Sequence, residues 1–447
     1  MIQGGQFYLS FYNRSIIISK KKKKTKIIDF TDAITFSNIL HAAYHVENGK
    51  KGQSHTNIFH INELGNCLEL CNQLLTNTYK IRKLYSFIIY EPKKRNITAN
   101  QFEDKIVHRV ACTKILEPVI QPKLIYDNYA SQPGKGTILA LERLQHFMRS
   151  YAATECNWSD EGWIFSGDIH HYFYEIDREI CMKQIEGLPI DKQCQDLIRK
   201  QIYAIGEYDG SEKGICIGFQ TSQWLAVYYL NGLDHFIKEK LHIKYYGRYM
   251  DNFYIIHKDK EYLQYCVKEI RKYLNEKLNL KLNDKSNIHP FNQGLVYLGF
   301  HFTYNKYTHD VDISLLKRNI NRMLKKTDKI LRLINEGKIS MDNGYDSHQS
   351  WYAYAQYSTK KNGENAHQKA LKKLNKKSAS LLYGYTKLDQ DSTGFIKLIP
   401  KQPRDSDGFI KLIPKGNYHN PFPYASHKNK KYKATVALND AMLNLPI

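Results

Sequence analysis

The chain has 447 residues, and its 66 lysines and arginines against 44 aspartates and glutamates give a formal net charge of +22. This length accommodates about two to four domains or one large enzyme, and so strong a positive charge predicts an anionic partner. The 34 tyrosines beside those cations favour RNA or DNA over a membrane, because bases stack on aromatic rings. A merely basic protein is the alternative. No apolar run reaches the length of about 18 residues that spans a membrane.

The eight cysteines are scattered along the chain. Cys67 and Cys71 share a predicted helix, but no second pair stands at the spacing of a zinc site. The apolar residues Ile16–Ile18 precede a lysine run, which is the reverse of the order in a secretory signal. We therefore expect reduced thiols, no structural zinc and a cytoplasmic location.

The N-terminal part alternates helical and strand-like patterns. Residues 1–35 are a basic segment, in which the consecutive lysines Lys20–Lys24 indicate a solvated loop. A strand rich in aromatic and β-branched residues is expected at 85–90. Apolar residues at helical spacing predict helices at 36–46, 63–75 and 99–116, the last with Thr98 as its N-cap.

A basic turn follows the strand at 85–90. Arg95 and Lys93 in this turn can present cations to a triphosphate, and Arg95 is preferred because guanidinium binds phosphate in a bidentate manner. A solvated hairpin is the alternative. Farther on, Gly134-Lys135-Gly136 lacks the spacing of a P-loop, which excludes that motif.

Two aspartates at predicted strand ends are the candidate metal-binding residues. Trp163–Asp168 is typical of a strand that ends in a carboxylate. Asp251 and Asn252 separate two runs of aromatic and β-branched residues, which predicts a β-hairpin with this pair at its tip. Carboxylates on rigid strands suit magnesium, and two cations roughly 3.5–4 Å apart would clamp both oxygens of a phosphoryl transfer. A single aspartate in a turn is usually structural, so only the pair in its context is informative.

Four motifs in order resemble those of prokaryotic reverse transcriptases, the kind found in retrons, group II introns, diversity-generating retroelements and phage-defence systems. The resemblance extends weakly over residues 36–385, and the combination is more specific than any one motif. The motifs are the first aspartate motif at 165–173, the GxPxGxxxSQ-like segment at 214–226, the Tyr-x-Asp-Asp-like box at 249–252 and the late palm strand at 298–300.

The resemblance implies an α+β right-hand polymerase with an antiparallel-sheet palm. The residues from 312 to 385 look helical and basic, as expected of a thumb that grips a duplex by its phosphates. The implied parts are a basic N-terminal segment (1–35), fingers (36–160), palm (161–305), thumb (306–385) and a C-terminal extension (386–447).

The resemblance also implies roles for individual residues. Asp168, Ile169 and Asp251 would form the metal site, for Mg²⁺ with Mn²⁺ as the alternative. Lys285 would be a general acid toward pyrophosphate, unless it is a surface lysine. Phe173 would lie under the sugar and exclude a 2′-hydroxyl, unless it is core. The catalytic set is Asp168, Asp251, Asn252 and Lys285, and the nucleotide-binding set is Arg95, Lys93, Ile169, Phe173, Ile217, Gly218 and Gln223.

Two positions depart from the usual pattern. Asn252 stands where the family usually has a second aspartate, so it keeps an oxygen ligand but loses a charge, which should weaken metal binding. Ile217 stands where retroviral enzymes carry glutamine. A branched aliphatic residue there also occurs in error-prone retroelement enzymes, and lower fidelity is therefore a hypothesis.

Two functions remain open. The first is an RNA-directed DNA polymerase that adds dNTPs to a 3′ end, in a phage-defence or domesticated retroelement system with a dedicated non-coding RNA. Its partners would be RNA, DNA product and dNTPs, with a protein partner or homo-oligomer open and no membrane. The second is an RNA-binding scaffold that has lost its chemistry, with Asn252 as the trace of that loss.

The C-terminal extension contains a duplicated segment. Residues 391–401 recur almost unchanged as residues 405–415. The two copies are expected to pair as a hairpin, or to dock on the sheet edge of another subunit. A functionally neutral duplication is the alternative.

Overall fold

The computed structural model describes residues 27–47, 54–90, 94–381, 385–390 and 396–400. Three predictions fall outside these residues: the Lys20–Lys24 loop, the phosphate contact of Lys93, and the pairing of the second repeat copy at 405–415.

The N-terminal part is a group of helices with one β-hairpin. The expected helices and strand are confirmed, but Thr98 is not a helix cap. It lies in a strand and pairs with Ser86, and the helix begins at Phe102 instead. The elements are α1 (Phe30–Ala33), α2 (Phe36–Glu47), α3 (Ser54–Ile61), α4 (Glu63–Leu75), β1 (Tyr85–Ile89), β2 (Arg95–Ala99), α5 (Phe102–Val110), a π-helix (Ala111–Leu116) and α6 (Glu117–Ile120).

The central part is a four-stranded antiparallel sheet with helices around it. Its strand order is β4-β5-β3-β6, and β6 is a strand that the sequence analysis missed. The elements are α7 (Thr137–Glu155), β3 (Trp163–Asp168), α8 (Tyr172–Glu175), α9 (Arg178–Glu186), α10 (Lys192–Asp209), α11 (Gln220–Tyr229), α12 (Asn231–His235), β4 (Tyr245–Tyr249), β5 (Asn252–His257), α13 (Lys260–Leu278) and β6 (Asn287–Pro290).

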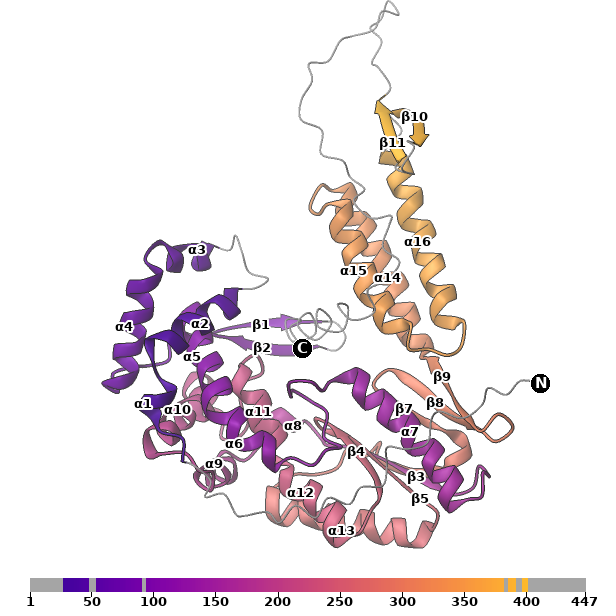
Figure 1. Cartoon of the computed structure of the whole chain (residues 1–447), viewed down its shortest axis with the longest axis horizontal. Coiled ribbons are helices and arrows are strands. Elements are labelled where there is room, and N and C mark those ends of the chain that lie inside the picture. The colour runs from indigo at the N-terminus through magenta and orange to yellow at the C-terminus, as the bar shows by residue number, and fades with distance from the viewer. Residues whose placement is uncertain (1–26, 48–53, 91–93, 382–384, 391–395, 401–447) are drawn as a thin grey trace, which may run out of the picture.

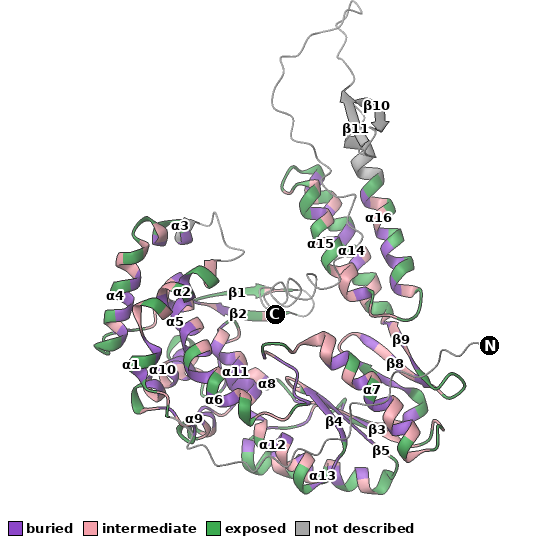
Figure 2. Cartoon of the chain, viewed as in Figure 1, coloured by how far each residue is buried: buried purple, intermediate pink, exposed green. Residues whose placement is uncertain are grey.

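Both faces of this sheet are buried, because successive side chains of a strand point to opposite faces. Phe165 of β3 and Phe253 of β5 pack in one core with α11 and α13. Their neighbours Ile164 and Tyr254 pack in a second core with α7. Figure 2 shows the central strands as buried along most of their length. A sheet held on two sides is a rigid support for residues at its strand ends.

A second antiparallel sheet and a helical bundle follow. The strand β9 corrects the expectation that residues from 312 onward are helical, since Val311, Ile313 and Leu315 alternate as buried residues along it. The elements are β7 (Leu295–Tyr297), β8 (Phe300–Asn305), β9 (Asp310–Leu315), α14 (Lys317–Asn335), α15 (Met341–Ala355) and α16 (Asn362–Leu381).

Part of the first repeat copy forms a strand in a two-stranded antiparallel sheet. Its strand β11 (Ile396–Pro400) pairs with β10 (Tyr385–Gln390), a segment outside the repeat. The expected hairpin between the two copies stays a prediction, because residues 405–415 lie outside the described part of the chain.

The parts are arranged as an open hand (Figure 1). Helices α1–α5 stand on one side, the bundle α14–α16 rises on the other, and the hairpin β1–β2 projects into the space between them. The two sheets lie at the base, with α7 beside them. This arrangement confirms the expected α+β class. Among the described residues, no helix combines the length and apolar character needed to cross a membrane.

Candidate active site

The hairpin of β4 and β5 carries one of the two aspartates on a two-residue turn. Tyr249 pairs with Asn252, so the turn residues are Met250 and Asp251. This corrects the prediction by one position, since Asn252 opens β5 and is not at the tip. Of the two turn residues only Met250 has a positive φ, at 53°, which is the φ pattern of a type II′ hairpin turn.

Asp168 ends β3 directly opposite Asn252. The loop before β6 fixes this strand end. The Asn283 main-chain N donates to the Asp168 main-chain O at 2.7 Å, and its Nδ2 donates to Oδ2 of the carboxylate at 3.1 Å. Ser286 Oγ accepts from the Asp168 N at 3.1 Å and donates to its O at 3.2 Å. Asn283 and Ser286 are therefore supporting residues that the sequence analysis missed.

The strand register brings the two carboxylates near each other, because Asp168 pairs with Asn252, the residue after Asp251. Burial, followed by the negative charge of Asp168, raises the pKa of Asp251. A hydrogen bond from Asn252 and the positive charge of Arg95 act in the opposite direction. Asp168 ends β3, Arg95 begins β2 and Asp251 lies in the β4–β5 turn, and the charges of Asp168 and Arg95 both act on Asp251. A cation between the carboxylates would relieve their repulsion.

The donor chemistry here fits a hard divalent cation. Two carboxylates meet here, and the described part of the chain contains no group of three or more histidine, cysteine, aspartate or glutamate side chains that could hold a metal ion. Mg²⁺ commonly binds through one or two carboxylates and completes its shell with water and substrate phosphates. The Ile169 side chain is buried in the core, so this residue can offer only its main-chain oxygen.

The loop from Gly214 to Phe219 is tied to the hairpin that carries Arg95. The Thr98 N in β2 donates to the Ile217 O at 2.9 Å. Gly218 has φ 125°, and a Cβ on it would lie 2.6 Å from the Thr98 O. Glycine is required here because only it tolerates both this φ and this approach. The fold thus places Ile217 and Gly218 against the strand of Arg95.

The remaining candidates are Phe173, Gln223 and Lys285. The Phe173 main-chain O accepts from the Ile215 N at 3.0 Å, and its partly buried ring packs against the main core. Gln223 Oε1 accepts from Ser131 Oγ at 2.9 Å. Lys285 is exposed, and its main-chain N donates to Asn283 Oδ1 at 3.1 Å, which links it to the loop that holds Asp168.

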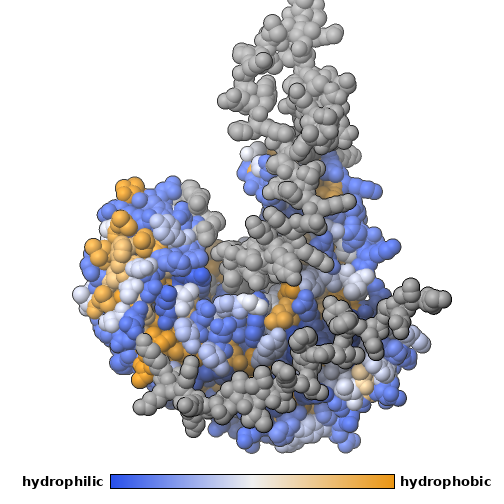
Figure 3. Space-filling view, viewed as in Figure 1, coloured by the Kyte–Doolittle hydropathy of each residue, from blue (hydrophilic) through white to orange (hydrophobic). Residues whose placement is uncertain are grey.

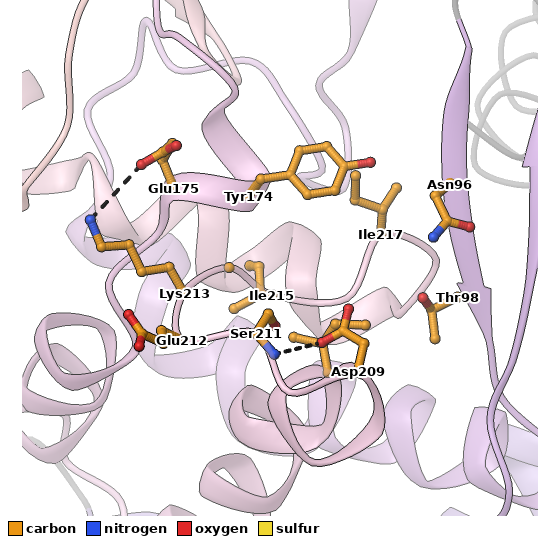
Figure 4. Close-up of a pocket in the computed structure, with 12 residues that line it drawn as sticks. Asn96, Thr98, Tyr174, Glu175, Asp209, Ser211, Glu212, Lys213, Ile215 and Ile217 are labelled. Carbon is orange, nitrogen blue, oxygen red and sulfur yellow. Dashed lines mark hydrogen bonds and ion pairs between the residues drawn. The ribbon is translucent and has the colours of Figure 1, made fainter.

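A cavity of about 400 Å³ lies beside the Ile217 loop (Figure 4). Asn96 and Thr98 of β2 line it opposite Tyr174 and the acidic residues that follow. Glu175 pairs with Lys213 there at 3.9 Å. Neither Asp168 nor Asp251 lines this cavity, so it is not the centre at which the two carboxylates act.

A comparison with known protein families found one match. Residues 90–302 match the family described as reverse transcriptase (RNA-dependent DNA polymerase). Together with the mixed helix and antiparallel-sheet architecture, this match identifies the right-hand polymerase fold that the motifs predicted.

No curated protein matches the chain. Among solved structures, the chain is similar to telomerase from Candida albicans in complex with a TWJ fragment of telomeric RNA, with 13% sequence identity and a TM-score of 0.39. The similarity covers 67% of this chain and 62% of the telomerase chain, so less than two thirds of that chain's length is spanned.

Proposed function

We propose, on the premise that residues 90–302 form a reverse transcriptase domain, that this chain is an RNA-directed DNA polymerase that adds dNTPs to a 3′ end. The observation that supports this most is the meeting of Asp168 and Asp251. One carboxylate ends β3, the other occupies the β4–β5 turn, and each lies within the electrostatic reach of the other.

Reverse transcriptase domains use divalent metals, and we propose Mg²⁺ with Mn²⁺ as the alternative. Asp168 and Asp251 would hold the metal ions, together with the main-chain oxygen of Ile169. When bound in a pair, such ions stabilise the charge that develops on the attacking and leaving oxygens. Asn252 would offer a neutral oxygen in place of a third carboxylate.

The chain's own residues would position the nucleotide. The Arg95 guanidinium, whose charge already reaches Asp251, would orient and neutralise the triphosphate. The backbone around Ile217 and Gly218 would form one wall with Gln223 behind it, and Phe173 would limit space at the 2′ position. Lys285 would hold a proton for the departing pyrophosphate.

The helical bundle would hold the nucleic acid. Its first helix, α14, carries a row of exposed cations, and Figure 3 shows a largely hydrophilic surface on the described part of the bundle. Cations on a helix bind phosphates without reading the sequence. These residues are Lys317, Arg318, Arg322, Lys325, Lys326, Lys329 and Arg332.

We place the fingers at residues 36–160, the palm from 161 and the thumb after the second sheet. Because β9 pairs with β8 along its whole length, we move the palm–thumb boundary from 305 to the end of β9 at Leu315. The basic segment 1–35 and the extension 386–447 flank this hand.

Within the family we propose a prokaryotic type that works with its own non-coding RNA, in phage defence or as a domesticated retroelement. The four ordered motifs, one of which is the box Tyr249-Met-Asp-Asn252, support it. Sequencing the RNA that co-purifies with the protein tests this proposal. Recovery of one discrete non-coding RNA is expected, and a random sample of cellular RNA would contradict it.

Asn252 supports a second candidate, a polymerase-shaped RNA scaffold without chemistry. The separating experiment is incorporation of labelled dNTPs by protein purified with its bound RNA, in Mg²⁺ and in Mn²⁺. The enzyme proposal expects a labelled product that disappears in Asp168→Ala and Asp251→Ala. RNA binding with no product in either metal would favour the scaffold.

A further inference from the structure

A fully buried ion pair lies directly beneath the turn that carries Asp251. Arg248 of β4 and Asp234 of α12 are both 0% exposed. Arg248 Nε donates to Asp234 Oδ1 at 2.7 Å, and its Nη2 donates to Oδ2 at 2.6 Å. This is the two-pronged geometry that lysine cannot reproduce.

The third guanidinium nitrogen is directed at the turn. Arg248 Nη1 donates to the main-chain O of Met250 at 2.8 Å. Met250 is the turn residue with positive φ, an uncommon conformation for a side chain of this size. The bond therefore fixes the peptide group that leads from Met250 into Asp251. Nη2 also donates to the Val227 O of α11 at 3.0 Å, so the guanidinium connects the turn to the helices behind the sheet.

The partner carboxylate is itself fully engaged. Tyr246 Oη donates to Asp234 Oδ1 at 2.6 Å, and Asn128 Nδ2 donates to Oδ2 at 3.2 Å. Although burial alone would lower the pKa of Arg248, the charge and hydrogen bonds of Asp234 raise it above its ordinary value. The guanidinium therefore stays charged and keeps its donors in one orientation.

Stability alone does not explain such a pair. Replacing a buried ion pair by well-packed apolar residues often leaves a protein equally stable or more stable, because both charges must be desolvated. What an apolar pair cannot supply is a donor at the Met250 carbonyl. The specific contribution of this pair is thus the hydrogen bond to the turn.

We propose that Arg248, held by Asp234, is a positioning residue that fixes the Met250–Asp251 turn and so holds the Asp251 carboxylate against Asp168. Its consequence for catalysis rests on the proposed function. Its consequence for the turn and for cation binding does not. The competing explanation is an ion pair that only stabilises the fold.

The first test compares Arg248→Lys with the native chain. Lysine keeps a buried cation but cannot both grip Asp234 and reach the Met250 carbonyl. We expect amide exchange at Met250–Asn252 to quicken by about tenfold or more, and Mn²⁺ affinity, measured by electron paramagnetic resonance with Mn²⁺ alone, to fall about 10- to 100-fold, as for changes behind a metal ligand. In the polymerase assay the half-saturating metal concentration should rise while the dNTP KM stays near its native value.

The matched control is Arg82→Lys. Arg82 also donates to a fully buried carboxylate, Asp104, at 3.2 Å, but that pair lies in the N-terminal helical part and has no bond to the turn. This variant should leave amide exchange at the turn and Mn²⁺ affinity unchanged. A similar loss of Mn²⁺ affinity in Arg82→Lys would overturn the specific role of Arg248.

A second variant guards against a failure to fold. The double change Arg248→Met with Asp234→Leu removes both buried charges and the donor to Met250 together. A folded double variant with fast exchange at the turn and weak Mn²⁺ binding supports positioning. A folded double variant with native exchange and native Mn²⁺ affinity overturns it. If these effects appear but the native chain incorporates no dNTP, the positioning role stands and the proposed function fails.

Discussion

Asp168 faces Asn252, not Asp251, across the pairing of β3 with β5. Asp251 lies in the turn, immediately before Asn252, and Asn252 Nδ2 lies 3.4 Å from Asp251 Oδ1. The residue that has lost its charge is thus the one in register with the first aspartate. The two carboxylates approach each other from a strand end and from a turn, and the proposed function gives them the main role in binding a cation.

This arrangement predicts unequal effects at the box. Asp251→Ala removes one of two carboxylates, and we expect dNTP incorporation to fall by more than the roughly 10- to 100-fold typical of residues behind a metal ligand. Asn252→Asp should keep or raise activity and lower the metal concentration needed, because it adds an anionic oxygen. Primer extension at several Mg²⁺ and Mn²⁺ concentrations measures both effects. Full activity in Asp251→Ala would refute the assignment.

Arg95 is predicted to act on the triphosphate. Arg95→Lys keeps the charge but loses the bidentate geometry, so the KM for dNTPs should rise about tenfold, the effect of roughly 1.4 kcal/mol. Steady-state kinetics at saturating primer measure it. Arg149→Lys is the control, since Arg149 pairs with Asp310 on an exposed surface. An unchanged KM in Arg95→Lys would favour the alternative, in which Arg95 belongs to a solvated hairpin and does not bind the triphosphate.

Phe173 is predicted to discriminate against ribonucleotides. Phe173→Ala should raise the efficiency of rNTP use relative to dNTP use by about tenfold or more, because a hydroxyl would gain the space that the ring occupies. Tyr174→Ala changes the exposed neighbouring ring and should not alter this ratio. If Phe173→Ala lowers the melting temperature without changing the ratio, the residue belongs to the core alone.

The sequence predicted the strand ends because aromatic and β-branched runs mark strands locally. It placed the turn one residue too late, since Asp251-Asn252 is a good turn pair by propensity. The register is set instead by the pairing of Tyr249 with Asn252 and by the bond from Arg248 to Met250. A hydrogen bond of this kind produces no pattern in the local sequence from which it could be predicted.

The supporting residues were unpredictable for a related reason. Asn283 and Ser286 contact Asp168 across more than a hundred residues of chain, and their own segment looks like an ordinary polar turn. The short strand β6 ends in proline, which hides it from a pattern search. Only the family resemblance of Lys285 pointed to this segment.

Position 218 is predicted to require glycine because of its φ angle and its close approach to β2, and not because the loop needs flexibility. Gly218→Ala places a Cβ 2.6 Å from the Thr98 O at φ 125°, and strain of this kind costs about 1–3 kcal/mol. We expect a lower melting temperature and weaker dNTP binding. Gly210→Ala is the control, because Gly210 also has a positive φ, of 73°, but its Cβ would meet nothing within 4 Å. Equal dNTP affinity in the two variants would show that Gly218 does not belong to the nucleotide site.

Asp251 is predicted to destabilise the metal-free protein near neutral pH. Burial and the charge of Asp168 raise the pKa of Asp251, so the native state binds this proton more tightly than the unfolded chain. Between the unfolded value of about 3.9 and the raised native value, stability falls as pH rises, and above that window the full loss is present.

The substitution Asp251→Asn removes this loss of folding stability, because asparagine carries no titrating carboxylate. In metal-free buffer at pH 7 its melting temperature should exceed the native one by a few degrees, and the difference should shrink as the pH falls through the window. Mg²⁺ should then raise the melting temperature of the native chain more than that of Asp251→Asn, because only the native chain keeps both carboxylates. Thermal scans from pH 4 to 7, with and without Mg²⁺, measure this. A variant less stable than the native chain at pH 7 without metal would show that the two carboxylates do not repel each other.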